Sequence, residues 1–189
     1  MQERLNHTEK QTLLRLAREA MTLRVQGKNL PRLDLASLPE ILREHGASFI
    51  TLTIHGQLRG CIGALEPYQP LAEDVREHAA AAALEDPRFA PVSESELSAI
   101  QIEVSRLTRP IPLEYSDAND LLSSLKPHVD GVILRDAFHR ATFLPQVWEK
   151  IPHPAEFLNQ LSLKMGLHEN AWRSKHLEVF TYQVDEFHE

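Results

Sequence analysis

The sequence contains a single cysteine, Cys61, so it can form no intrachain disulfide bond and no metal or iron–sulfur site built from several cysteines. It also lacks a long apolar run. The longest, residues 79–84, is far shorter than the roughly 20 residues that cross a bilayer. These two absences favour a cytoplasmic protein in a reducing compartment, with no membrane among its partners.

Glycine motifs that cradle phosphates are absent too. Neither a GxGxxG nor a GxxxxGK[ST] pattern occurs, so the sequence predicts neither a dinucleotide-binding fold nor a P-loop. The net charge of −7 and the lack of a basic run argue against a nucleic-acid partner. The ten histidines include no HExxH pair, so we expect no dedicated metal site. No motif in the sequence indicates a particular cofactor.

What the sequence does contain is a mixture of helical and strand patterns. Apolar residues recur at helical spacing in residues 8–25, 70–85 and 154–165, which predicts three main helices. Alternating patterns, which predict strands, lie in residues 47–55, 58–63, 100–105, 131–135, 139–144 and 177–184. Because helices and strands do not alternate regularly, we predict an α+β fold with a largely antiparallel sheet and flanking helices. A chain of this length predicts a single domain over residues 1–189.

The most informative stretch is Leu58-Arg59-Gly60-Cys61-Ile62-Gly63. In a regular strand Arg59, Cys61 and the gap at Gly63 share one face, while Gly60 and Gly63 leave space for a backbone or a ligand. A guanidinium beside the thiol favours the thiolate, which makes Cys61 a candidate nucleophile. The alternative is a small buried hydrophobic residue, the usual role of a free cysteine.

The hairpin that carries this stretch has two possible registers. A two-residue loop at Gly56-Gln57 places Cys61 opposite Leu52, on the apolar face. A three-residue loop over residues 55–57 instead pairs Ile54 with Leu58 and Thr51 with Cys61. We favour the second register, because matching apolar faces fixes the pairing more strongly than one turn dipeptide does.

Three further segments carry candidate site residues. Asp86 and Arg88 supply a carboxylate and a guanidinium, although a helix stop stabilised by an Asp–Arg pair is the alternative. Glu103 lies on the polar face of a strand and is a candidate general acid or base; a solvated strand face is the alternative. Arg140 and Thr142 alternate outward on another strand and could contact an anion, or simply face solvent.

Together with the Leu58–Gly63 stretch, four segments follow in order: Asp86-Pro87-Arg88-Phe89, Ile102-Glu103-Val104-Ser105, His128-Val129-Asp130-Gly131-Val132 and Thr142-Phe143-Leu144-Pro145-Gln146-Val147. This series resembles the AMMECR-type domain family. The resemblance implies two unequal lobes with the motif residues near a cleft. It also implies a place in the AmmeMemoRadiSam system, where prokaryotic members are encoded beside Memo-like and radical-SAM proteins.

Two functional hypotheses follow. In the first, the protein is an enzyme in which Cys61 is the nucleophile and Glu103 transfers a proton. A small anionic ligand is then held by a set of binding residues, namely Arg59, Gly60, Gly63, Asp86, Arg88, Arg140 and Thr142. In the second, the same cleft is a non-catalytic module that holds a ligand or a partner of that system, Memo-like or radical-SAM. An exposed, reactive thiol favours the first hypothesis, and a buried, inert thiol favours the second.

Overall fold

The computed structural model describes residues 4–189, which group into two compact units. Unit 1 comprises residues 4–108 and 185–189, and unit 2 comprises residues 109–184. In each unit helices lie beside strands that pair antiparallel, which confirms the predicted α+β class. The single domain and its cleft stay predictions.

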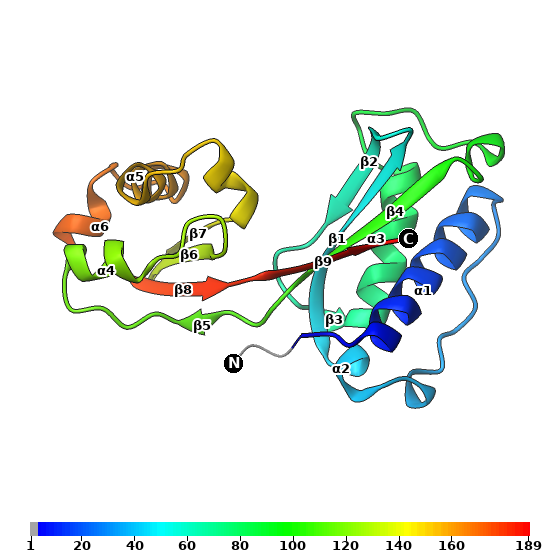
Figure 1. Ribbon diagram of the computed structural model, residues 1–189, viewed down its shortest axis with the longest axis horizontal. Helices are drawn as coiled ribbons and strands as arrows, with labels where there is room; N and C mark the ends of the chain where they lie inside the picture. The colour runs from blue at the N-terminus through cyan, green and yellow to red at the C-terminus, as the bar shows by residue number, and fades with distance from the viewer. Residues whose placement is uncertain (1–3) are drawn as a thin grey trace. The chain divides into compact units, whose positions relative to one another are not determined.

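Unit 1 is built on a sheet whose strands run in the order β2-β1-β4-β9, with the short β3 beside β1. The strands are β1 (His45–Ile54), β2 (Gln57–Gly63), β3 (Gln69–Pro70), β4 (Ile100–Leu107) and β9 (Val184–His188). The helical segments are α1 (His7–Val25), η1 (Leu35–Ser37), α2 (Glu40–Arg43), α3 (Leu71–Leu84) and η2 (Glu94–Glu96). Figure 1 shows α1 and α3 together on one side of this sheet.

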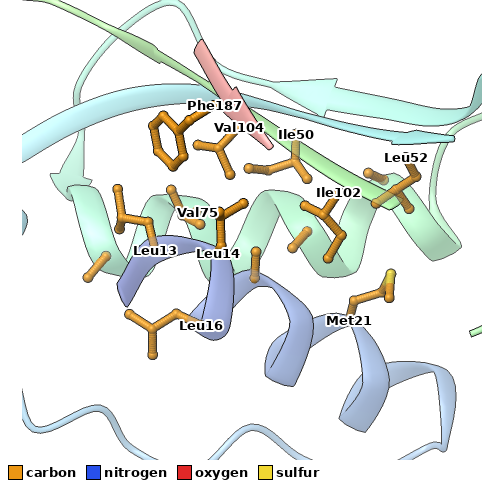
Figure 2. Close-up of a cluster of buried hydrophobic side chains, with 14 of the residues drawn as sticks. Leu13, Leu14, Leu16, Met21, Ile50, Leu52, Val75, Ile102, Val104 and Phe187 are labelled. Atoms are coloured by element: carbon orange, nitrogen blue, oxygen red, sulfur yellow. The ribbon is translucent and has the colours of Figure 1, made fainter. Parts of the chain in front are cut away.

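The core of unit 1 lies between these two helices and the sheet. In Figure 2, Leu13 and Met21 of α1, Val75 of α3, and Ile50 and Ile102 of the strands meet in one layer, and all five are fully buried. Because side chains alternate along a strand, the residues between the buried ones point to the opposite, more polar face of the sheet. That outer face carries the candidate site.

Unit 2 has its own sheet, in the order β5-β8-β6-β7. Its strands are β5 (Ile111–Pro112), β6 (Gly131–Asp136), β7 (His139–Phe143) and β8 (Glu178–Tyr182). Its helical segments are α4 (Ala118–Ser124), η3 (Pro145–Glu149), α5 (Pro154–Lys164) and α6 (Ala171–Ser174). They enclose a second core in which the rings of Trp148 and Phe157 stack with their centroids 3.6 Å apart.

The C-terminal strand pattern divides between the two sheets. The predicted strand over residues 177–184 corresponds to β8, and the chain continues after Gln183 into β9, which pairs in the other sheet. Val179 on β8 and Phe187 on β9 are both buried, each in a different core. Because both strands contain buried residues and follow each other directly, periodicity alone does not reveal that the chain changes sheets.

Helix α3 and strand β2 approach each other closely at Gly60. A Cβ atom built at Gly60 would lie 2.0 Å from the carbonyl oxygen of Ala82. The small side chains over residues 79–83 allow this approach. The space predicted at Gly60 is therefore present, and a helix backbone fills it.

We expect Gly60→Ala to destabilise the protein strongly, because the clash is with a main-chain oxygen that cannot rotate away. Overpacking of this kind costs about 1–3 kcal/mol or more. The control is Gly27→Ala, where nothing lies within 4 Å and only the positive φ of 68° is strained, at about 1 kcal/mol. Urea denaturation measures both variants, and equal midpoints would contradict the close approach.

Candidate functional site

The hairpin between β1 and β2 turns at His55 and Gly56, which both have positive φ, at 51° and 76°. Two such residues form the mirror-image two-residue turn that suits the twist of a hairpin. The register begins with Ile54 opposite Gln57, so the predicted pairing of Ile54 with Leu58 is wrong.

A β-bulge then corrects the register within β2. Thr53 lies opposite Leu58 but Leu52 lies opposite Gly60, so Arg59 is the extra residue. Beyond the bulge Thr51 lies opposite Cys61, as predicted. The two-residue turn lies at His55-Gly56, so neither the predicted Gly56-Gln57 loop nor the three-residue loop is correct, and the bulge restores the matched apolar faces.

The bulge also interrupts the alternation that would keep Arg59 on the face of Cys61. Its guanidinium binds Glu96 instead, with Nε 2.8 Å from Oε1, and Nη1 donates to the carbonyl of Ala90 at 2.9 Å. Arg59 and the backbone of Ser93 hold the pKa of Glu96 down to about 2. Arg59 therefore links the loop after α3 to strand β2. The sequence predicted instead that its guanidinium would lie beside the Cys61 thiol.

The main chain of Cys61 is held by Asp86 and Arg88. The Cys61 N–H donates to Oδ2 of Asp86 at 2.8 Å, and Nη2 of Arg88 donates to the Cys61 carbonyl at 3.3 Å. Asp86 also accepts from Nε and Nη2 of Arg88, at 2.9 and 2.7 Å. This Asp86–Arg88 clamp occupies the free edge of β2, where an added strand would otherwise pair.

The electrostatics of the clamp follow from its hydrogen bonds, which outweigh the effect of burial on Asp86. The Asp86 side chain is 2% exposed, and hydrogen bonds from Arg88 and from the Cys61 N–H hold its pKa far below the usual range. Arg88 is 54% exposed on its other side, so a fixed cation faces solvent next to Cys61.

The thiol itself lies in a row of side chains that crosses three strands. Thr51 Oγ1 donates to Cys61 Sγ at 3.4 Å, and on its other side Thr51 lies opposite Glu103 of β4. Cys61 and Glu103 are two strand spacings apart, roughly 10 Å. Direct proton transfer between them is too long, so Glu103 can act only on a group that spans part of the row.

Glu103 has an unusual environment for a residue on a polar face. It is half-buried, and burial together with the nearby Glu186 carboxylate raises its pKa, while His188 opposes the rise. Both neighbours come from β9. The carboxyl therefore keeps its proton to higher pH than an exposed glutamate, which suits a proton donor.

Gly63 resembles Gly60 in that the protein itself fills the space. A Cβ atom there would lie 2.4 Å from the carbonyl oxygen of Ser48 and 2.5 Å from the ring of Phe49. Both glycines thus serve packing in this fold.

Arg140 and Thr142 lie on β7 of unit 2. The Thr142 hydroxyl is 3.0 Å from the hydroxyl of Tyr182, whose pKa burial raises to about 12. Arg140 lies opposite Arg135, which binds Glu178 at 2.7 Å. A ligand contact by Arg140 or Thr142 stays a prediction.

Two other features of unit 1 lie away from Cys61. A hollow of about 360 Å³ on the exposed side of α3 is lined by Arg24, Glu73 and Glu77 among others. In the core, Asp74 accepts from Ser48 at 2.6 Å and contacts His78 at 3.2 Å. Asp74 contacts both the serine and the histidine, which differs from the order of contacts in a Ser-His-Asp triad. Over residues 4–189, no group of three His, Cys, Asp or Glu side chains is placed to hold a metal.

The sequence model of the AMMECR1 family matches residues 14–187. The chain belongs to the AMMECR1 family. It is 40% identical over 187 residues to a protein of Methanothermobacter thermautotrophicus, covering 98% of this chain and 96% of that protein. A Thermofilum pendens protein is 37% identical over 202 residues, with coverage of 97% and 91%. The crystal structure of the uncharacterized protein PH0010 from Pyrococcus horikoshii is similar, with a TM-score of 0.77, 30% identity, and coverage of 98% and 93%.

Membership of the AMMECR1 family confirms the family that the motifs indicate. The fold of the Pyrococcus horikoshii protein matches this α+β chain almost from end to end. In the described part of the chain, no helix is both long and apolar enough to span a membrane.

Glu96→Gln should lower stability at pH 7 and flatten its dependence on acid. A carboxylate whose pKa falls on folding stabilises the protein above its unfolded pKa and loses that contribution as the pH drops through the folded pKa. For Glu96 this window runs from 4.5 to about 2. Denaturation midpoints across this range test it, with the exposed Glu94→Gln as control. Parallel curves for Glu96→Gln and wild type would contradict the Arg59–Glu96 anchor.

Glu103→Gln should raise the stability of the protein at pH 7, the opposite of the effect expected for Glu96→Gln. A carboxyl whose pKa is raised on folding loses stability as the pH rises through the unfolded and folded pKa values, because the fold disfavours the charged form. The amide should therefore melt at a higher temperature at pH 7 and at nearly the wild-type temperature at pH 3. A lower melting temperature at pH 7 would show that the charged Glu103 stabilises the fold.

Proposed function

We propose that the protein binds a small anionic ligand on the outer face of the unit 1 sheet, around Cys61, and that Cys61 attacks an electrophilic carbon of that ligand. The observation that supports this most is the Asp86–Arg88 clamp. It fixes a half-exposed guanidinium beside the main chain of the protein's sole cysteine. A cation held in advance loses little conformational entropy when it binds an anion.

In this proposal Arg88 contacts the anionic group and Asp86 positions Arg88. Cys61 Sγ forms a bond to the electrophilic carbon, the bond to the leaving group breaks, and Glu103 gives its proton to the leaving group. The roughly 10 Å between Cys61 and Glu103 requires a ligand that lies across β1. Arg59, Gly60 and Gly63 shape the strand without touching the ligand.

We place this activity in the cytoplasm, within a system of the AmmeMemoRadiSam type. The lone thiol supports a reducing compartment, because a cysteine without a disulfide partner stays a free thiol there. The Memo-like and radical-SAM partners rest on the resemblance of the motifs alone.

The second candidate is a non-catalytic module that holds a ligand or a partner protein of that system. The observation that favours it is that several residues of the motif already have structural roles in the fold. Gly60 and Gly63 accept neighbouring backbone, and Arg59 anchors a loop. Residues so used need no catalytic explanation.

Two alkylating reagents of different charge test the anion site without a known ligand. Iodoacetate is an anion and iodoacetamide is neutral, and Cys61 is the one thiol in the sequence that they can alkylate. If Arg88 draws anions to the thiol, the ratio of the iodoacetate rate to the iodoacetamide rate should exceed that of the unfolded protein by about three- to tenfold. The excess should shrink as salt is raised.

Arg88→Gln should abolish this excess and Arg88→Lys should keep part of it. Arg59→Gln is the matched control, since its guanidinium binds Glu96 and should affect stability but not the ratio. If Arg88→Gln leaves the ratio of the two rates unchanged, the proposed anion site at Arg88 is contradicted. If Cys61 is labelled only after denaturation, the nucleophile hypothesis is contradicted and the non-catalytic binding module is favoured.

A further inference from the structure

We propose that Thr51 is a positioning residue whose hydroxyl orients Cys61 Sγ and stabilises the negative charge that the sulfur carries when it reacts. This inference rests on the proposed function, in which Cys61 is a nucleophile. It starts from the bulge at Arg59, which brings Thr51 and not Leu52 opposite Cys61.

The backbone pattern brings these two side chains close together. Both main-chain groups of Cys61 point away from β1, to Asp86 and Arg88. Thr51 and Cys61 therefore form a non-hydrogen-bonded antiparallel pair, the kind in which facing side chains lie nearer to each other. The 3.4 Å between Oγ1 and Sγ is the result.

Thr51 is also rigidly supported. It lies in β1, which has β2 on one side and β4 on the other, and it faces Glu103 across the second pairing. A β-branched side chain has few rotamers in a strand, so the direction of the hydroxyl is set by the sheet. A donor held in this way stabilises the charged sulfur over the neutral thiol.

Arg88 also interacts with the side chain of Cys61, since hydrogen bonds and charge interactions with Asp86 and with Cys61 raise the pKa of Arg88. The Arg59 guanidinium binds Glu96 and Ala90, and Nη2 of Arg88 reaches the carbonyl of Cys61 and the carboxylate of Asp86. Glu103 is roughly 10 Å away. Thr51 is thus the neutral donor to a sulfur that also lies beside the Arg88 cation.

The test is the pH profile of iodoacetamide alkylation of Cys61 in Thr51→Val, Thr51→Ser and Thr53→Val. Thr53 is two residues along the same strand, on the same face, opposite Leu58, and so controls for the loss of a threonine hydroxyl. We expect Thr51→Val to move the profile to higher pH and to slow alkylation at pH 7 about three- to tenfold, the worth of one hydrogen bond. Thr51→Ser and Thr53→Val should follow the wild type.

A Thr51→Val profile that overlays the wild type would overturn the proposal, as would a Thr51→Ser profile that follows Thr51→Val. If Thr51→Val fails to fold, Thr51→Ala replaces it under the same criteria. The ratio of iodoacetate to iodoacetamide separates this inference from the proposed function. Loss of the Thr51 hydroxyl should slow both reagents equally and leave the ratio unchanged, whereas loss of Arg88 changes the ratio.

Discussion

The carboxylate of Asp86 is the group on which the candidate site depends. It binds the Cys61 N–H and the Arg88 guanidinium at once, and it is almost completely buried while doing so. Removing one partner of such a pair leaves a buried charge uncompensated, which costs far more than the intact pair contributes. The position of the thiol, the closed edge of β2 and the direction of Arg88 therefore follow from one interaction.

The α+β class could be predicted from the sequence because periodicity reports burial, and burial is what both sheets share. The bulge at Arg59 could not, because it depends on His55 adopting a positive φ. That conformation is uncommon for a residue other than glycine, and the His-Gly dipeptide is a weaker turn signal than Asn-Gly. Strand β9 shows the second limit, since an alternating pattern does not say which sheet a strand joins.

For the site, the sequence singled out Cys61, Asp86, Arg88 and Glu103, and placed Thr51 opposite Cys61 through the matching of apolar faces. It could not show that Arg59 turns to Glu96, because that pair depends on the loop after α3. Nor could it separate a glycine that admits a ligand from one that admits a backbone. Both need a missing side chain, and only the position of Ala82 decides between them at Gly60.

Two carboxyl groups of unit 1 are pushed in opposite directions by their surroundings. Hydrogen bonds to a cation and an N–H lower the pKa of Asp86, whereas burial and a neighbouring carboxylate raise the pKa of Glu103. The surroundings therefore favour the charged form of Asp86 and disfavour that of Glu103. The charged form of Asp86 stabilises the fold and that of Glu103 does not, so stability explains an acid at position 86 but not at position 103. A residue that costs stability is where function is the better explanation.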